Sequence, residues 1–341
     1  MTAKRTERDL AARELPRRSM LMGAAAAVAA PIAVSAVAPP AVAGPGTVGA
    51  AEAGRTRRLT MYAEELPGDL VGYGLAPGEA TVPGPVLEIW EGDTLEITLV
   101  NNTGQRLSIH PHGVDYGVDS DGSHLNDSFN EPGETRTYTW RSRAPYRSER
   151  GVWMPGSAGY WHYHDHAMTP HGTEGIRRGL YGALVVRRQG DVLPDRQYTV
   201  VFNGMTINNQ VAPDTPLLEA RLGERAEFIC IGHGNMLHTF HLHAHRWVDN
   251  RTGMLAGPQD PTPSVDNKDL NPGTSFGFQV IAGEGVGPGA WMYHCHVQFH
   301  SDAGMSGIFL VRNEDGSLPE GAQAALDRFH AHAHAHAHEK E

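Results

Sequence analysis

The stretch WMYHCHVQFH, residues 291–300, places Cys295, one of only two cysteines in the chain, between His294 and His296. Successive side chains of a β-strand point to opposite faces, so a strand here would turn the Cys295 thiol away from both flanking imidazoles. A thiolate and imidazoles are the side chains that bind soft and borderline metal ions. The spacing therefore predicts that Cys295 binds one metal ion and that its two neighbours bind others.

The other donors near this cysteine in the sequence indicate copper rather than zinc. His300 and Met305 follow it by five and ten residues, and His238 lies three residues before His241. Two imidazoles, one thiolate and one thioether are the ligands of a blue-copper electron-transfer centre. Zinc also accepts His and Cys, but it rarely recruits Met and carries no electrons. Cys230, in the apolar run EFICIG, is interpreted as a small buried hydrophobe rather than as a disulfide partner.

Four H-x-H pairs recur along the chain. On a strand, residues i and i+2 share one face about 6.5–7 Å apart, so adjacent imidazoles can reach different ions of one cluster. A single pair is usually a surface pair or a satisfied core pair, whereas four pairs at equivalent positions favour a metal cluster. The pairs are His110/His112, His164/His166, His241/His243 and His294/His296.

The pairs belong to an internal repeat. The pattern W-x-Y-H-x-H begins at Trp161 and again at Trp291, 130 residues later. GDTLEITLV (92–100) matches GERAEFICI (223–231) in the same order. Matches in one order at nearly one offset indicate a duplication, and each copy has the size of a single domain.

The two copies differ at the ligands of the thiol site. The first copy has Leu107, Asp165 and Leu180 at the positions that correspond to His238, Cys295 and Met305. We therefore expect the mononuclear site in the second copy only.

The segments that position these residues are predicted to be β-strands. Short runs such as TRTYTW, QYTVVFN and SFGFQVI are β-branched or aromatic and end at Gly, Pro or Asp, and the chain has 40 glycines and 23 prolines for its turns. No long stretch shows helical periodicity. The expected fold is all-β, with two Greek-key sandwiches or barrels near residues 55–188 and 189–315. Residues 316–341 are expected to form a disordered, His-rich tail.

The N-terminal segment resembles an export signal. Arg17-Arg18 precede an alanine-rich apolar run, and an A-x-A cleavage pattern ends at Ala43, so residues 1–43 predict a twin-arginine signal followed by a linker at 44–54. An ordinary secretory signal is the alternative. The run is too short to be a good membrane span. We expect a secreted protein without a membrane span in its mature chain, and the net charge of −11 argues against nucleic-acid binding.

Four motifs together resemble the multicopper oxidases, specifically the two-domain small laccases of bacteria. They are HPHG (110–113), YHDH (163–166), HTFHLH (238–243) and HCHVQFHSDAGM (294–305), and the resemblance covers about residues 55–315. It implies two cupredoxin-like domains and four copper ions per chain. The implied type 1 ligands are His238, Cys295, His300 and Met305; the implied type 2 ligands are His110 and His241; and the implied type 3 ligands are His112, His164, His166, His243, His294 and His296.

The same resemblance implies a mechanism. Small phenolic or aromatic reductants would give electrons at the exposed edge of His300, and Cys295 would pass them to His294 or His296. Four such steps would reduce O₂ to water at the cluster. The reaction consumes protons, and Asp121 in DYGVDSDG is favoured over Asp115 and Asp119 as the residue that relays them. The alternative is that each of these residues is an ordinary carboxylate in a turn. Tyr116 is either a redox-active phenol near the type 2 copper or a core tyrosine.

Several histidines lie outside the motifs. His162 and His245 flank ligands and are expected to support them, whereas His124, His171 and His233 have no motif support. The tail histidines, His332 to His338 at every second position, either buffer copper or nickel weakly or belong to a merely soluble tail.

The cluster requires ligands from both copies, and the connection at 187–198 is short. A head-to-tail contact between chains would solve this and can close into a ring, so we expect a homotrimer, as in the small laccases. A ferroxidase or cuprous oxidase, a copper nitrite reductase and a copper carrier without turnover remain alternatives.

Overall fold

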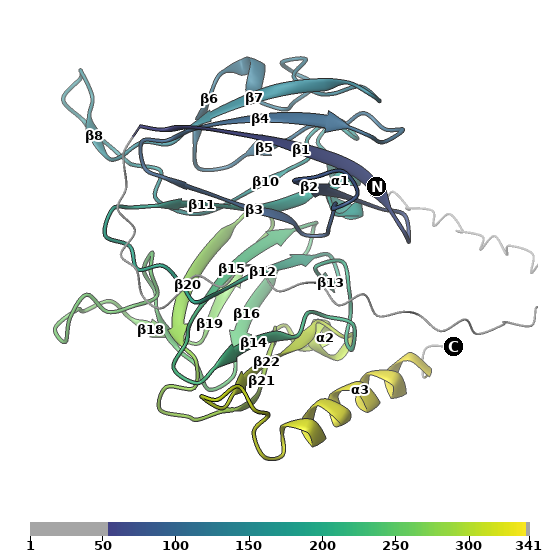
Figure 1. The fold of residues 1–341 in the computed structure, drawn as a ribbon, viewed down its shortest axis with the longest axis vertical. Helices are drawn as coiled ribbons and strands as arrows, with labels where there is room; N and C mark the ends of the chain where they lie inside the picture. Colours follow the sequence, from purple (N-terminus) through teal and green to yellow (C-terminus); the bar gives the residue numbers. More distant parts are fainter. Residues whose placement is uncertain (1–53, 339–341) are drawn as a thin grey trace, which may run out of the picture. The chain divides into compact units, whose positions relative to one another are not determined.

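The computed structural model describes residues 54–338, and side chains through residue 331. The predicted export signal lies outside the described residues. The chain is mostly β, as predicted, and its four main sheets lie one above another in Figure 1. No described helix is long and apolar enough to cross a membrane.

The first two sheets form the first barrel, which spans residues 56–187. One sheet has the order β2-β1-β4-β7-β6, and the other has the order β3-β11-β10-β5. The strands of the first sheet are β1 (Thr56–Leu66), β2 (Leu70–Gly74), β4 (Thr94–Asn101), β6 (Asp115–Tyr116) and β7 (Thr135–Arg141). Those of the second are β3 (Gly84–Trp90), β5 (His110–Pro111), β10 (Gly159–His164) and β11 (Tyr181–Arg187). Buried residues of both sheets, including Ile97, Trp140 and Tyr163, form one core.

The other two sheets form the second barrel, which spans residues 196–312. Their orders are β13-β12-β15-β20 and β14-β22-β21-β16-β19. The third sheet contains β12 (Arg196–Asn203), β13 (Thr206–Ile207), β15 (Arg225–His233) and β20 (Ser275–Ile281). The fourth contains β14 (Leu218–Arg221), β16 (His238–Leu242), β19 (Asn267–Leu270), β21 (Gly289–Cys295) and β22 (Ser306–Arg312).

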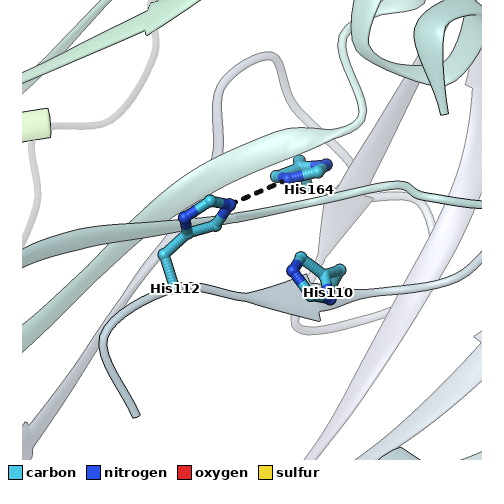
Figure 2. A group of neighbouring side chains, drawn as sticks. All are labelled: His110, His112 and His164. Carbon is cyan, nitrogen blue, oxygen red and sulfur yellow. Dashed lines mark hydrogen bonds between the residues drawn. The ribbon is translucent and has the colours of Figure 1, made fainter. Parts of the chain in front are cut away.

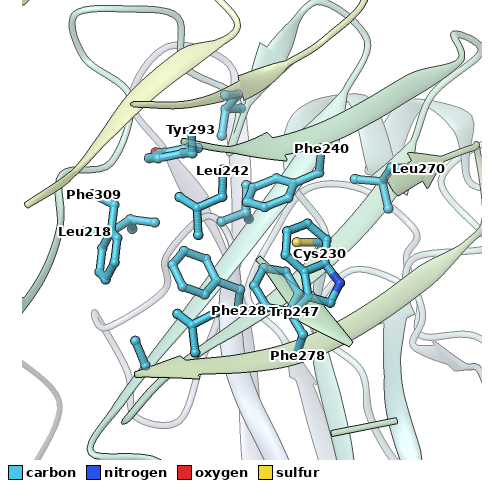
Figure 3. Close-up of a cluster of buried hydrophobic side chains, with 14 of the residues drawn as sticks. Leu218, Phe228, Cys230, Phe240, Leu242, Trp247, Leu270, Phe278, Tyr293 and Phe309 are labelled. Atoms are coloured by element: carbon cyan, nitrogen blue, oxygen red, sulfur yellow. The ribbon is translucent and has the colours of Figure 1, made fainter. Parts of the chain in front are cut away.

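An aromatic core fills the second barrel. Figure 3 shows Phe228, Phe240, Trp247 and Phe278 gathered around Cys230. The rings of Trp247 and Phe278 stack with centroids 3.8 Å apart, an arrangement typical of tightly packed aromatic pairs. Both cysteines are buried and free, which confirms that Cys230 is a core residue without a disulfide partner.

The middle two sheets are buried on both faces because the barrels pack against each other there. Side chains of β10 and β11 meet those of β12 and β15 in a third apolar cluster that includes Tyr160, Val185 and Ile229. A buried ion pair completes this interface: Arg187 donates to both carboxylate oxygens of Glu227, at 2.6 and 2.7 Å. The Tyr160 hydroxyl donates to the same carboxylate at 2.6 Å.

Short elements occupy the connections. They are β8 (Tyr146–Arg147), β9 (Trp153–Met154), β17 (Trp247–Val248), β18 (Ser264–Val265), the 3₁₀ turn η1 (Val118–Ser120) and the helices α1 (Thr173–Arg178), α2 (Gln298–Asp302) and α3 (Ala322–His338).

The prediction of a disordered tail from residue 316 is wrong for most of this segment. Residues 322–338 form helix α3, and Ala322, Leu326 and Phe329 pack against Ile308 and Leu310 of β22. The spacing i, i+4, i+7 places these three apolar residues on one helix face. The alternation of His with Ala after residue 329 obscured this short apolar face in the sequence.

Candidate metal centres

Strand β21 separates its cysteine from the neighbouring histidines, as the alternation predicts. Cys295 is fully buried in the core of the second barrel, where it pairs in register with Phe240 of β16. His294 instead pairs in register with His241. The rings of His294 and His296 stack with centroids 5.5 Å apart. The thiol and the two imidazoles therefore belong to separate groups of donors.

The thiol group joins three elements. His238 begins β16, Cys295 ends β21, and His300 lies in α2. The Cys295 Sγ atom lies 3.6 Å from Nδ1 of His238 and 3.5 Å from Nδ1 of His300. All three ligand atoms lie within 4.8 Å of one another. This spacing suits three donors that converge on one metal ion.

Met305 is buried beside this group. Its carbonyl oxygen accepts the Cys295 N–H at 3.0 Å, and its own N–H donates to the His300 carbonyl at 3.0 Å. These two bonds fix the turn after α2, which brings residue 305 back to residue 295. The fourth predicted donor therefore lies in the same part of the core.

The electrostatics of the thiol group favour a bound cation. Burial raises the pKa of the Cys295 thiol and lowers the pKa of His238 to about 4 and that of His300 below its usual value. Both imidazoles are therefore neutral at pH 7, and a metal ion would displace the thiol proton. A thiolate with two neutral imidazoles and a nearby thioether fits copper.

His300 is less accessible than the sequence indicates. Its side chain is only 5% exposed, which corrects the expectation of an exposed edge. The adjacent Phe299 and the Leu237 next to His238 are 69% and 67% exposed. An exposed apolar side chain therefore lies next to each of the two imidazoles in the sequence.

A second group in the same barrel contains imidazoles alone. Ligand nitrogens of His241, His243 and His294 lie within 4.8 Å of one another. The Nε2 atoms of His243 and His294 face each other at 3.2 Å. The Nδ1–H groups of His241 and His294 donate to the carbonyls of Asp266 at 2.7 Å and Cys295 at 2.8 Å. These bonds leave Nε2 of each ring free to bind a metal.

The first barrel repeats this arrangement. Figure 2 shows His110, His112 and His164 turned toward one another, with Nε2 of His112 and of His164 3.1 Å apart. The Nδ1–H groups of His110 and His164 donate to the carbonyls of Asp121 at 2.6 Å and Asp165 at 2.7 Å. Each barrel thus has two imidazoles whose Nε2 atoms face each other, and a third imidazole whose Nδ1–H donates to a loop carbonyl.

Each barrel has a fourth imidazole near its group. The ring of His166 lies 5.1 Å from that of His110, and the ring of His296 lies 5.4 Å from that of His241. The structure therefore brings the eight histidines of the H-x-H pairs into two sets of four, one set in each barrel.

Burial keeps most of these imidazoles neutral. It lowers the pKa of His112 to about 4, that of His164 well below its usual value, and the pKa values of His110, His243 and His294. Two facing neutral nitrogens can share only one proton, so a cation between them satisfies both lone pairs. The donor sets fit a copper cluster.

The two imidazole sets lie on different sheets of one chain. His110 and His164 belong to the sheet of β5 and β10, whereas His241 and His294 belong to the sheet of β16 and β21. The sheet of β12, β15 and β20 lies between these two sheets (Figure 1). Among the residues whose side chains are described, no ring contact or ligand group joins the two sets.

Asp121 and Tyr116 lie beside His110. The Asp121 Oδ1 atom lies 3.6 Å from Nδ1 of His110, and the Tyr116 ring lies 5.7 Å from the His110 ring. Burial tends to raise the pKa of Asp121, but hydrogen bonds from Ser123 and Asn126 outweigh this and lower it. Burial and the Asp121 carboxylate raise the pKa of Tyr116. Both residues contact the imidazole group and are partly accessible to solvent.

Two buried histidines lie beside the first group: His162, which the sequence predicts to support the ligands, and His233, which no motif in the sequence singles out. The ring of His162 stacks on that of His112 with centroids 3.9 Å apart, and the His233 ring lies 5.0 Å from His162 and 5.5 Å from His164. The stacked ring limits the rotation of His112. His233 ends β15 in the other barrel, so no local spacing in the sequence could place it here.

The remaining histidines have other roles. His245 donates from Nδ1 to the His243 carbonyl at 3.0 Å and accepts the Gly283 N–H at Nε2, also at 3.0 Å, which is a structural arrangement. His124 lies 2.8 Å from the Ala167 carbonyl. His171 is exposed near His166.

Comparison with known proteins places both barrels in one family. Two models described as "Multicopper oxidase" match residues 78–191 and 191–315. The chain is 33% identical over 283 residues to a probable nitrite reductase-hydroxylamine oxidoreductase fusion protein of Kuenenia stuttgartiensis, covering 76% of this chain and 30% of that protein. It is 26% identical to ferroxidase HEPHL1 of Mus musculus, covering 69% of this chain and 23% of the relative. The chain thus spans about a third or less of the length of these curated relatives.

Solved structures share the fold. The multicopper oxidase mgLAC superimposes with a TM-score of 0.58 at 22% identity, covering 78% of this chain and 88% of that chain. The copper nitrite reductase from Nitrosomonas europaea gives a TM-score of 0.56 at 22% identity, covering 75% and 94%.

Proposed function

Since the chain belongs to the multicopper oxidase family, we propose that it is a laccase-type oxidase. The proposed reaction couples the one-electron oxidation of phenolic or aromatic compounds to the four-electron reduction of O₂ to water. The observation that carries it is the position of Cys295, which joins the thiol group to the imidazole group through the adjacent His294.

The proposed ligand assignment follows the three groups of donors and the two fourth imidazoles. The type 1 copper would be bound by His238, Cys295, His300 and Met305; the type 2 copper by His110 and His241; and the type 3 pair by His112, His164, His166, His243, His294 and His296. Four copper ions would supply one-electron transfer at the thiol group and O₂ reduction at the imidazole groups.

The protein's own contribution begins with the link between the groups. His294 follows Met292 and Tyr293 along β21 and is bonded directly to Cys295, and its Nδ1–H donates to the Cys295 carbonyl at 2.8 Å. The peptide bond and this hydrogen bond fix the imidazole relative to the thiol. Nε2 of His294 is thereby held toward His243, on the other face of the strand.

The surface beside the thiol group supports an aromatic reductant. Leu237 and Phe299 are exposed next to the two imidazoles that bracket the Cys295 thiol. Apolar side chains at an exposed site favour contact with an apolar ring over a hydrated metal ion. This is the reason to prefer phenols over Fe(II) as reductants.

Asp121 is the proposed source of protons for O₂ reduction. Its carboxylate lies beside the Nδ1 edge of His110, accepts hydrogen bonds from Ser123 and Asn126, and remains partly exposed to solvent. It can therefore exchange protons with water while it faces the imidazole group. Tyr116, whose ring lies 5.7 Å from the His110 ring, is the proposed redox-active phenol.

We also propose a homotrimer, in which the first barrel of one chain contacts the second barrel of the next. The interposed sheet keeps the two imidazole sets of one chain apart, so a second copy must supply the missing half of each cluster. A head-to-tail contact that closes after three copies would complete three clusters. A fully active four-copper monomer in size-exclusion chromatography would overturn this arrangement.

A metal-ion oxidase is the second candidate, because ferroxidase HEPHL1 and ceruloplasmin are among the relatives. Oxygen uptake with a methoxyphenol, Fe(II) and Cu(I), and nitrite reduction in a parallel assay, separate the candidates. The proposal expects the methoxyphenol to give the highest kcat/KM. Faster turnover of Fe(II) would replace laccase by ferroxidase, and turnover of nitrite alone would replace it by nitrite reductase.

A further inference from the structure

A cavity lies where the connection between the two barrels meets the second barrel. Its volume is about 140 Å³, and its charged lining residues are Arg187, Asp191, Arg225 and Arg251. One water requires roughly 10–15 Å³ of such space, so the cavity has room for several waters or for a small ion. Val192, which also lines it, is exposed, so solvent reaches the cavity.

Strand β15 directs Arg225 toward the first barrel. Residues two apart on a strand share a face, so Arg225 lies on the same face as Glu227. Glu227 pairs in register with Gln279 of β20 and binds Arg187 of β11. The strand alternation therefore places the Arg225 guanidinium beside the buried ion pair that joins the barrels.

Carboxylates neutralise two of the three guanidinium groups in the cavity wall. Arg187 is paired with Glu227, and Arg251 donates to both carboxylate oxygens of Asp191, to one of them at 2.6 Å. The Nε–H group of Arg187 is nevertheless buried and has no hydrogen-bond partner. The wall of the cavity thus retains an unused buried donor.

Arg225 supplies a positive charge that no carboxylate balances. Its guanidinium donates to the neutral Oε1 atom of Gln279 at 3.0 Å. The nearby Asp195 carboxylate accepts the backbone N–H of Arg225 at 2.8 Å instead. Among the residues whose side chains are described, no carboxylate forms an ion pair with Arg225. A half-buried guanidinium loses part of its hydration, so an anion in the cavity would stabilise it.

We propose that this cavity binds a small oxyanion, either phosphate or a short carboxylate, through the Arg225 guanidinium. The planar guanidinium group matches the spacing of phosphate and carboxylate oxygens. Because the cavity is bounded by the connection after β11 and by β15 and β20, the anion would hold this connection against the second barrel. The site shares no residue with the metal-donor groups and does not depend on the proposed oxidase activity.

Calorimetric titration of the full-length, copper-loaded protein tests the site. Inorganic phosphate and acetate are titrated separately at one ionic strength set with chloride, and the tighter binder identifies the class of anion. Arg225→Gln should weaken its binding at least about tenfold, because a charged hydrogen bond is lost. Arg58→Gln makes the same change of charge at an exposed ion pair of the first barrel and should keep the native affinity. Binding of neither anion to the native chain, or equal affinities in the two variants, would overturn the proposal.

Asp191→Asn tests the same site with the opposite sign. It removes the carboxylate that lines the cavity and frees the Arg251 guanidinium, while the amide oxygen can still accept the Arg188 N–H. The anion should therefore bind about threefold or more tightly than to the native chain. It should also raise the thermal midpoint of this variant more than that of the native chain at equal concentration. Unchanged or weaker binding by Asp191→Asn would contradict the proposal, whether or not Arg225→Gln folds.

Discussion

The two barrels place different residues at the same point of the same fold. In the second barrel, Cys295 faces the core with its Sγ within 3.6 Å of two imidazoles. In the first barrel, Asp165 occupies the equivalent position and is also fully buried. Its carboxylate accepts the N–H groups of Ser108 at 2.8 Å, Met168 at 2.9 Å and Ala167 at 3.2 Å. One barrel therefore has a group of candidate metal ligands where the other has a hydrogen-bonded carboxylate.

The residues around this position also differ, with apolar side chains in the first barrel and candidate ligands in the second. Leu107 and Leu180 are fully buried in the first core where His238 and Met305 lie in the second. The outward-facing imidazoles, by contrast, keep nearly the same geometry, with facing Nε2 pairs at 3.1 and 3.2 Å. The two barrels therefore differ in the side chains that face the core, whereas both have imidazoles on the outward-facing side. Under the proposed function, this difference places electron entry in the second barrel alone.

The largest expected effect is that of removing the thiol. Cys295→Ser should abolish the blue absorption and lower turnover on the order of a thousandfold or more, since the link to His294 loses its metal-bound end. Visible spectra, copper content and turnover with a methoxyphenol measure this. Cys230→Ala, in the same core but away from the imidazoles, is the matched control and should stay blue. A blue, active Cys295→Ser protein would refute the assignment.

The next effect concerns the contact that holds the barrels together. Glu227→Gln leaves the buried Arg187 without its charged partner and should lower the free energy of unfolding by about 3–5 kcal/mol. The exposed pair Arg58–Glu96 is the control, and Glu96→Gln should cost less than about 1 kcal/mol. Urea denaturation measures both, and equal costs would show that the buried pair has no special role.

The same pair predicts a pH dependence. Burial tends to raise the pKa of Glu227, but hydrogen bonds and attraction from Arg187 outweigh this and lower it. A carboxylate with a lowered folded-state pKa stabilises the protein above its unfolded pKa, and this stability is lost as the pH falls through the folded value. The native chain should therefore lose stability below about pH 4.5 more steeply than Glu227→Gln. Parallel acid-denaturation curves would contradict this.

A smaller effect is expected at the equivalent position of the first barrel. Asp165→Ala should cost about 2–3 kcal/mol of stability, because it leaves buried N–H groups without acceptors. Asp165→Asn should cost less, since Oδ1 can still accept from Ser108 and Ala167. Both variants should keep the blue absorption. Its loss in a protein that remains folded would place part of the thiol site's chemistry in the first barrel.

The smallest effect is expected for a substitution that gives the second barrel the residue found at the equivalent position of the first. Met305→Leu introduces the residue found at Leu180 and conserves volume, so stability should change by less than about 1.5 kcal/mol. The blue colour should remain, while the reduction potential of the site should rise because the thioether donor is lost. Leu180→Met in the first barrel should change neither property. A potential that stays unchanged in Met305→Leu would remove Met305 from the ligand set.

Local spacing predicted much of the site because strand alternation is a local property. It correctly separated Cys295 from His294. The repeat correctly indicated that each barrel contains two H-x-H motifs at equivalent positions. The burial of His300 was not predictable in this way, since it depends on how α2 packs against the barrel. His233 lies near His162 only because the two barrels pack against each other. Helix α3 forms where its three apolar residues pack against β22. These features depend on tertiary packing, which short-range patterns do not encode.

The most direct measurement is anomalous diffraction at the copper edge from crystals of the copper-loaded protein. The account predicts one peak among His238, Cys295 and His300, and no peak at Asp165. It also predicts three peaks between the first-barrel imidazoles of one chain and the second-barrel imidazoles of another. A peak at Asp165, or a complete copper cluster formed within a single chain, would contradict it.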